Sequence, residues 1–278
     1  MRILSLEKEP FHAISFASAG GQGKVDRVFL PFYRATVDVL PDGVAAIAAM
    51  SDLQGREIGS LDPGTPRLLG QVVAEELWLL SENRELPPSH QTGIILAGDL
   101  FTGASLDKRG EEGNVETVWE AFADGFPWVA GVAGNHDLFD NPDFDTQAFS
   151  MHPYSNIFVL NKSVTDIGGF RIGGVSGIVG NPKKPFRREE QSFLDALKDV
   201  IQKRPDLLVL HQNTDIQIAG RSIVDHLEQF SLEMNTRPLV ICGHHHWENP
   251  LFTTRRGLQI LNVDSAVSIL NLDCPCRS

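Results

Sequence analysis

The feature that most constrains this chain is a repeated alternation between short apolar runs and longer amphipathic stretches. From Leu68 to Leu80, for example, apolar residues recur at helical spacing and would form one stripe on a helix. The short runs between such stretches have the length and composition of strands. This alternation predicts an α/β fold built from layers of helices and sheets. The predicted helices are Pro66–Glu82, Glu111–Ala123, Arg187–Lys203 and Gln217–Met234, and the predicted strands are Val44–Ser51, Gly93–Ala97, Trp128–Ala133, Phe170–Val175, Leu207–Leu210, Leu239–Cys242, Leu251–Thr254, Gln259–Val263 and Val267–Leu270.

Residues 1–43 fit this alternation poorly. Phe11–Ser18 and Val25–Val39 are strand-prone, and a turn signal follows them at Pro41-Asp42-Gly43. We interpret residues 1–43 as an N-terminal extension, a hairpin or an edge addition, packed on a main domain of residues 44–278. The glycine-rich segment 20–24 invites comparison with a phosphate-binding loop, but Val25 stands where that motif has Ser or Thr. No helix pattern follows, so we predict a flexible turn.

The charge and the cysteines of the 278-residue chain limit the classes of partner and the compartments that we expect for it. A formal net charge of -12 disfavours capture of long nucleic acids or anionic membranes, because their phosphates are repelled. The three cysteines are too few for a disulfide framework, which favours a reducing compartment. The start of the chain turns charged early, and no run approaches about 18 uninterrupted apolar residues. Together these features predict a soluble, cytoplasmic protein.

Polar residues follow five of the predicted strands at the point where each strand ends. Strand ends on one side of an α/β sheet are where binding sites collect. Carboxylate, amide oxygen and imidazole together suit Mn, Fe, Zn or Mg ions rather than metals that prefer thiolates. The sequence therefore predicts a metal site formed by strand-end residues, and these are Asp52 with Gln54, Asp99, Asn135 with His136, His211, and His244 with His246.

The order of these pieces resembles the calcineurin-like metallophosphoesterase superfamily. The pieces are Asp52-x-Gln54, Gly98-Asp99, Gly134-Asn135-His136-Asp137, His211 and Gly243-His244-x-His246. The resemblance implies a four-layer α/β/β/α sandwich of two mixed β-sheets flanked by helices, with residues 44–278 as the metallophosphoesterase domain. It also implies a dinuclear metal centre that hydrolyses phosphoesters.

The resemblance assigns a role to each strand-end residue. Asp52, Gln54 and His246 would hold one divalent ion, while Asn135, His211 and His244 would hold the other. Asp99 would bridge the two ions. His136 would face the substrate phosphate and either donate a proton to the leaving oxygen or steady the phosphate. The implied reaction is attack on the phosphorus by a metal-bridging hydroxide.

Two departures from the family pattern refine this expectation. Gln54 stands where the family has His, and its amide oxygen is a weaker and harder donor, so we expect Mn or Mg to be preferred over Zn, with Mn favoured. Alternatively, Gln54 only hydrogen-bonds a metal-bound water. The residues after Asp99, and Asp137 in place of Glu, differ from the protein phosphatases of the superfamily. These differences favour small phosphodiesters or phosphomonoesters as substrates, and they leave His136 without an obvious acidic partner.

Two other functions remain open from the sequence. A nuclease is disfavoured by the net charge of -12. A non-catalytic metal-binding scaffold on the same fold is disfavoured because His136 and most ligands are present. The basic segment 181–188 could be a lid over an anionic part of the substrate, but a solvated loop is the favoured interpretation.

Overall fold

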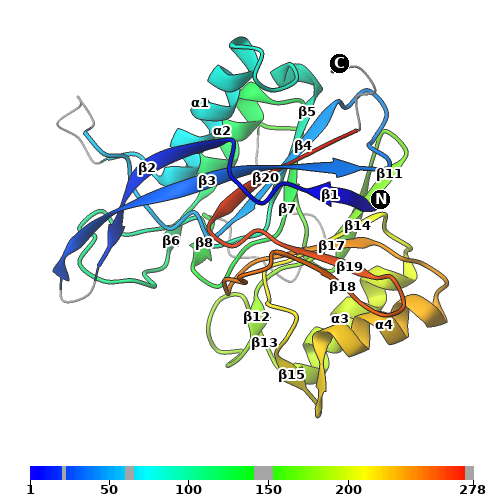
Figure 1. Cartoon of the computed structure of the whole chain (residues 1–278). Helices are drawn as coiled ribbons and strands as arrows, with labels where there is room; N and C mark the ends of the chain where they lie inside the picture. Colours follow the sequence, from blue (N-terminus) through cyan, green and yellow to red (C-terminus); the bar gives the residue numbers. More distant parts are fainter. Residues whose placement is uncertain (21–22, 60–65, 141–152, 273–278) are drawn as a thin grey trace.

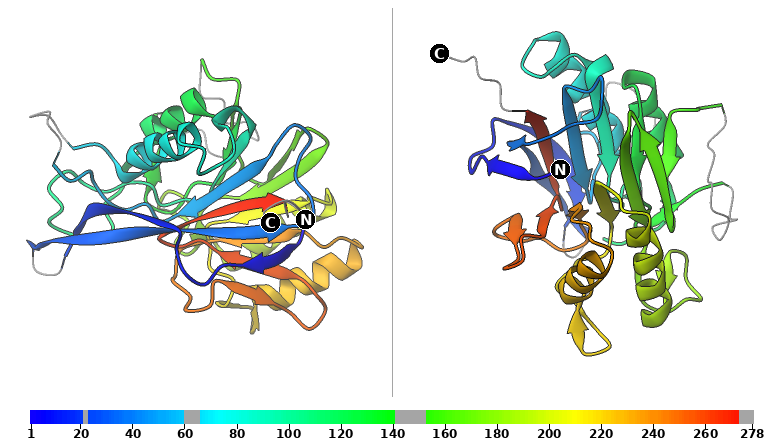
Figure 2. Two further views of the ribbon diagram at one scale, coloured as in Figure 1. Left: turned by 45° about the horizontal axis from the view of Figure 1, so that its top comes forward. Right: turned by 90° about the vertical axis from the view of Figure 1, so that its right-hand side faces the viewer.

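The computed structural model describes residues 1–20, 23–59, 66–140 and 153–272. In this part of the chain two β-sheets pack face to face, and helices cover the outer side of each sheet (Figure 2). Both sheets contain parallel and antiparallel pairs. The predicted four-layer α/β/β/α sandwich is therefore confirmed.

The first sheet has eight strands in the order β1-β3-β20-β4-β5-β7-β9, and β2 pairs with β3 outside this path (Figure 1). Its long strand β3 is antiparallel to β1 and β2 and parallel to β20, so the N-terminal strands join the same sheet as the strands that follow. The boundary predicted at residue 43 stays a prediction. The strands are β1 Ile3–Leu6, β2 His12–Ala19, β3 Val25–Val37, β4 Ala46–Ser51, β5 Thr92–Leu96, β7 Val129–Gly131, β9 Ile157–Val159 and β20 Ala266–Leu272.

The second sheet has six strands in the order β10-β11-β14-β17-β19-β18. Its four central strands are parallel, and the two edge strands are antiparallel to their neighbours. The strands are β10 Ser163–Ile167, β11 Phe170–Val175, β14 Leu207–Leu210, β17 Leu239–Cys242, β18 Leu251–Thr253 and β19 Gln259–Asn262. Three two-stranded pairs complete the described part: β6 Gly113–Asn114 with β8 Asp137–Leu138, β12 Ile178–Val179 with β13 Arg187–Arg188, and β15 Gln217–Ile218 with β16 Arg221–Ser222.

Helices α1 (Leu69–Glu82) and α2 (Glu116–Gly125) pack on the first sheet, and α3 (Glu190–Gln202) and α4 (Ile223–Glu233) pack on the second. A short 3₁₀ helix, η2 (Ser89–Gln91), precedes β5. All four predicted helices are present, but each begins later than predicted.

The start of α4 shows why the predicted boundaries were too early. The prediction began at Gln217, but Ala219 and Gly220 have positive φ angles of 50° and 77° and form the turn of the β15–β16 hairpin. Ser222 then caps the helix by accepting a hydrogen bond from the Asp225 N–H at 3.1 Å. A left-handed turn followed by a cap ends the hairpin and fixes the first turn of the helix.

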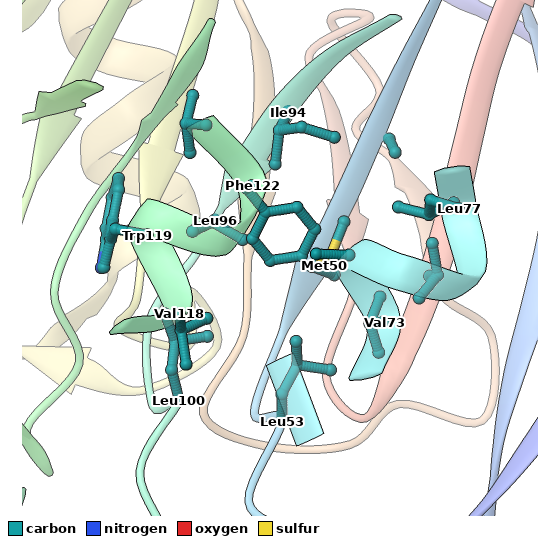
Figure 3. Packing of buried hydrophobic residues seen from close by; sticks show 14 of the residues in the cluster. Met50, Leu53, Val73, Leu77, Ile94, Leu96, Leu100, Val118, Trp119 and Phe122 are labelled. Atoms are coloured by element: carbon teal, nitrogen blue, oxygen red, sulfur yellow. The ribbon is translucent and has the colours of Figure 1, made fainter. Parts of the chain in front are cut away.

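Alternate residues of each buried strand serve different layers of the core. In β4, Ala48 and Met50 face α1 and α2 and pack in a cluster that includes Phe122 (Figure 3). Ile47 and Ala49 face the opposite way and pack against the second sheet. Because both faces are covered, the strand is apolar from Ala46 to Met50.

No helix within the described residues is both long enough and apolar enough to cross a lipid bilayer.

Candidate metal centre

The predicted ligands lie in loops that follow β4, β5, β7, β14 and β17, so both sheets contribute to one site. Asp52, Asp99 and His244 each have a positive φ, at 55°, 55° and 68°. Residues other than glycine rarely adopt this backbone conformation, and those that do are concentrated at functional sites. A sharp turn within the first three residues after each strand brings the three side chains toward the same place.

Asp99, His211 and His244 form the centre of the site. One potential ligand atom from each residue lies within 4.8 Å of the other two. Asp99 and His211 are buried, and their Oδ2 and Nε2 atoms lie 3.4 Å apart. The His211 and His244 rings meet edge to face with their centroids 4.9 Å apart. One carboxylate and two imidazoles at this spacing are a suitable donor set for a divalent cation.

Buried donor atoms also point to a cation. The His211 Nδ1 atom lies 2.8 Å from the Ala97 carbonyl oxygen, which leaves Nε2 directed at the cluster. The buried Asn135 Oδ1 has no hydrogen-bond partner among the described residues, and His211 Nε2 has only the Asp99 carboxylate, 3.4 Å away. A buried polar atom left unpaired costs about 1–3 kcal/mol, and a bound cation would remove that cost. The residues present therefore fit a divalent metal ion.

The charges of the centre are strongly coupled. Burial alone would raise the pKa of Asp99, but the neighbouring His211 charge lowers it to about 2. Burial opposes protonation of His211, but the Asp99 carboxylate raises the pKa of that ring to about 10. Burial and the His211 charge lower the pKa of His244 to about 4. His244 is thus neutral at pH 7, as a ligand must be.

Asp52 is held beside the centre. Its Oδ2 atom accepts hydrogen bonds from the Ser51 hydroxyl at 2.5 Å and from the His244 backbone N–H at 2.9 Å. Burial raises the pKa of Asp52 to about 8, and the nearby carboxylates of Asp264 and Asp99 contribute to the rise. Carboxylates gathered at a site that is at least partly buried are stabilised by a cation.

The other two residues predicted for the first ion are placed differently. Gln54 donates a hydrogen bond from Nε2 to Asp99 Oδ2 at 3.1 Å. His246 is exposed and is not part of the cluster that Asp99, His211 and His244 form. The structure therefore brings Asp52 and Gln54 beside Asp99 and leaves His246 at the surface.

His136 lies beside the centre as well. Its backbone N–H donates to Asp99 Oδ1 at 3.0 Å, and its Nε2 atom lies 3.9 Å from Asp99 Oδ2. A Cβ atom on Gly110 would lie 3.2 Å from the His136 ring, so the glycine allows the loop to pass close to it. Asp99 is thus the acidic neighbour of His136, which the Gly134-Asn135-His136-Asp137 piece alone does not indicate.

Two acidic residues matter here that were not predicted as site residues. Asp137 is buried and accepts hydrogen bonds from the backbone N–H groups of Asp99, Leu100 and Gly134 at 2.9, 2.7 and 2.7 Å. It therefore ties the loops after β5 and β7 together. Asp264 lines the same cavity, and it also follows an apolar strand, so the signal used for the other ligands applies to it.

A cavity of about 520 Å³ opens over the centre. Its floor includes Asp52, Gln54, Asp99, His136 and His244, and its walls come from the β2–β3 hairpin and the loop 102–111. The volume suits a small organic ligand.

The basic segment 181–188 lies outside the lining of this cavity. Arg187 and Arg188 form β13, which pairs with β12, and the Arg187 Nη1 atom lies 3.4 Å from a Glu112 carboxylate oxygen. Residues 181–185 are exposed, as expected of a solvated loop, whereas Arg187 and Arg188 are half-buried in β13. The tail cysteines, Cys274 and Cys276, lie outside the described residues.

Comparison with known proteins agrees with the geometry. The family model for calcineurin-like phosphoesterases matches residues 45–248. A search of curated proteins finds no match to the chain. The family match spans most of the chain and covers every predicted ligand, and we conclude that this protein belongs to the calcineurin-like phosphoesterase family.

Proposed function

We propose that this protein hydrolyses small phosphodiesters or phosphomonoesters with the help of two divalent cations, manganese being favoured. A metal-dependent phosphoesterase is what the family and the cluster of Asp99, His211 and His244 support. The observation that carries the proposal is the convergence of buried donor atoms: Asp99 Oδ2 lies 3.4 Å from His211 Nε2, and the buried Asn135 Oδ1 has no hydrogen-bond partner among the described residues.

The donors divide naturally around Asp99. Asn135, His211 and His244 would hold one ion, and Asp52 with Gln54 would hold the other, while the Asp99 carboxylate, whose Oδ2 atom faces both His211 and Gln54, would be shared between them. His246 would complete the second group only after its side chain turns inward from the surface. When bound, two dications stabilise negative charge on the attacking and leaving oxygens and make a nucleophile available at neutral pH.

His136 supplies the proton chemistry in this proposal. Its ring lines the cavity beside Asp99, and its backbone N–H is fixed on Asp99 Oδ1. An imidazole held there can donate a proton to the leaving oxygen or hydrogen-bond a phosphate oxygen.

The cavity and the net charge support a small substrate. A volume of about 520 Å³ holds one phosphoester of modest size. The formal charge of -12 disfavours long nucleic acids, so a nuclease is the weaker alternative. The predicted reducing, cytoplasmic location is compatible with such a substrate.

The test is a panel of phosphomonoesters and phosphodiesters, cyclic nucleotides among them, assayed with added Mn²⁺ and again with a chelator. We expect turnover that depends on the metal and returns when Mn²⁺ is restored after chelation. Absence of turnover in both conditions would support the non-catalytic scaffold instead. Turnover of duplex DNA that falls steeply with salt would support the nuclease.

A further inference from the structure

The cavity over the metal centre has an apolar wall that lies outside the family match. Phe16, Val28 and Phe29 line the cavity and belong to β2 and β3, whereas the match begins at residue 45. Figure 1 shows this hairpin in blue, projecting to the left beyond the rest of its sheet. The wall is therefore a feature of this chain rather than of the matched family region.

The hairpin is fixed to the loop that carries Asp52 and Gln54. Ala17 and Arg56 exchange two backbone hydrogen bonds, each of 2.8 Å. The Phe16 ring packs directly on Gly55, where a Cβ atom would overlap it. Because Gly55 and Arg56 follow Gln54 immediately, the wall is held in register with the metal ligands.

A second contact fixes the hairpin on the far side of the cavity. Arg109 Nε donates a hydrogen bond to the Ala19 carbonyl oxygen at 2.8 Å. The next residue, Gly110, passes against the His136 ring. The hairpin is thus connected to both loops that flank the centre, and its position over the cavity is part of the folded site.

The wall presents apolar side chains that the core does not use. Phe16 is buried, but its cross-strand partner Val28 is 37% exposed and Phe29 is 63% exposed. Exposed apolar side chains gathered at a cavity, rather than scattered singly, mark a ligand surface. Aromatic rings favour this kind of surface because they bury much apolar area and pack on Phe in preferred geometries.

We propose that the β2–β3 hairpin selects phosphoesters whose alcohol carries a flat apolar ring, such as an aryl group or a nucleobase. The phosphate lies at the metal centre, and the ring lies against Val28, which is on the same face of the hairpin as Phe16. Phe29 follows Val28 on the strand and contributes the edge of the cavity. This inference rests on the proposed phosphoesterase function and adds the substrate class to it. Val28 and Phe29 determine specificity and take no part in bond breaking.

The test compares ring-bearing and aliphatic esters on wild-type protein and a Val28→Ser/Phe29→Ser double variant. The monoester pair is phenyl phosphate and glycerol 2-phosphate, and the diester pair is a nucleoside 3′,5′-cyclic phosphate and glycerophosphocholine. For the ring-bearing member, we expect KM to rise about tenfold in the double variant, the change expected from losing roughly 55 Å² of buried apolar contact. We expect kcat, and KM for the aliphatic member, to stay within about twofold of wild type.

Val25→Ser is the matched control. Val25 lies on the same strand and is 55% exposed, but it does not line the cavity. Both KM values should be unchanged in this variant. A Val28→Leu/Phe29→Tyr variant, which keeps the apolar surface, should retain the preference for the ring.

Two results would overturn the inference. One is equal KM values in wild type and the double variant for the ring-bearing ester. The other is a uniform fall in kcat for all four esters, which would indicate a structural role.

Calorimetric binding of phenyl phosphate and glycerol 2-phosphate to the Mn²⁺-loaded protein separates this inference from the proposed function. A wild type that turns over no ester but binds phenyl phosphate more tightly, with the preference lost in the double variant, refutes only the proposed function. Equal binding of both ligands by an inert wild type overturns both.

Discussion

The Oδ2 atom of Asp99 lies 3.4 Å from the Nε2 atom of His211, and both side chains are buried. Without a cation the two form an ion pair. The His211 charge lowers the pKa of Asp99, and the Asp99 charge raises the pKa of His211, so both groups are charged at neutral pH. The proton on His211 then occupies the position where a metal ion would meet the imidazole. Metal binding at this site must therefore displace protons.

We predict that Mn²⁺ binding releases protons and tightens as the pH rises. At pH 7 His211, with a pKa of about 10, and Asp52, with a pKa of about 8, both carry a proton in the metal-free protein. A ligand must be deprotonated, so raising the pH weakens this competition, first at Asp52 near pH 8 and then at His211 toward pH 10. Calorimetric titrations with Mn²⁺ at pH 6, 7 and 8, in buffers of different ionisation enthalpy, measure both effects. A His90→Gln variant, altered at an exposed histidine away from the centre, should behave as wild type. Heats that do not depend on the buffer would contradict the prediction.

His136→Ala should separate proton donation from metal binding. The His136 ring lines the cavity but is not one of the clustered donors. We therefore expect unchanged Mn²⁺ content and a fall in kcat of about 10²–10⁴-fold, as for loss of a general acid. His245→Ala, at an exposed neighbouring imidazole, should change neither quantity. Full turnover by His136→Ala with bound metal would show that the ring has no role in proton transfer.

Asp137→Asn should destabilise the protein, although Asp137 is not a predicted ligand. Each of its carboxylate oxygens accepts from backbone N–H groups, so an amide nitrogen in either position would face a donor. We expect the free energy of unfolding in urea to fall by about 1–3 kcal/mol. The control is Asp166→Asn, because Asp166 is an exposed carboxylate that accepts one backbone N–H, and it should change stability by less than about 0.5 kcal/mol. Equal effects of the two substitutions would mean that Asp137 does not hold the loops together.

The parts of the fold that the sequence predicts well are those where both faces are buried. The bounds of β11, β14 and β17 agree with prediction to the residue. β14 and β17 are uninterrupted apolar runs, which leave little choice of strand ends, and β11 has Arg171 as its one exposed residue. Short strands such as β9 and β10 were not predicted. In β10 every residue is at least partly exposed, so no apolar run marks it. The predicted helix starts were too early for a different reason. A left-handed turn such as the one at Gly220 interrupts the helix, but it does not change the apolar spacing of the sequence.

The candidate site also has parts that the sequence predicts and parts that it does not. His211 and His244 meet as the strand-end positions suggested, because β14 and β17 are parallel neighbours. Asp99 follows β5 of the other sheet, so its place beside them depends on how the two sheets pack. The tie made by Asp137 could not be predicted, since it depends on backbone N–H groups of a loop distant in sequence. The surface position of His246 depends on the conformation of the loop after β17, which apolar spacing does not specify.

The departure at Gln54 leads to a prediction about metal selectivity. Gln54 Nε2 donates to Asp99 Oδ2 at 3.1 Å in the absence of a cation, and rotation of the amide would present its oxygen to a bound ion. An amide oxygen suits Mn²⁺ and Mg²⁺, whereas imidazole also suits Zn²⁺. We therefore expect Gln54→His to bind Zn²⁺ about 10–100-fold more tightly while its Mn²⁺ affinity changes much less.

Competition titrations of Zn²⁺ and Mn²⁺ against a chelating indicator would measure both affinities for wild type, Gln54→His and Gln54→Ala. If Gln54 is a ligand, Gln54→Ala should lose Mn²⁺ affinity, because the alanine offers no donor in its place. If Gln54 only hydrogen-bonds a metal-bound water, Gln54→Ala should keep most of that affinity while Gln54→His still gains Zn²⁺ affinity. Unchanged affinity and selectivity in Gln54→His would mean that residue 54 does not reach the ion, since an imidazole within bonding distance of a dication cannot leave the Zn²⁺ preference unaltered.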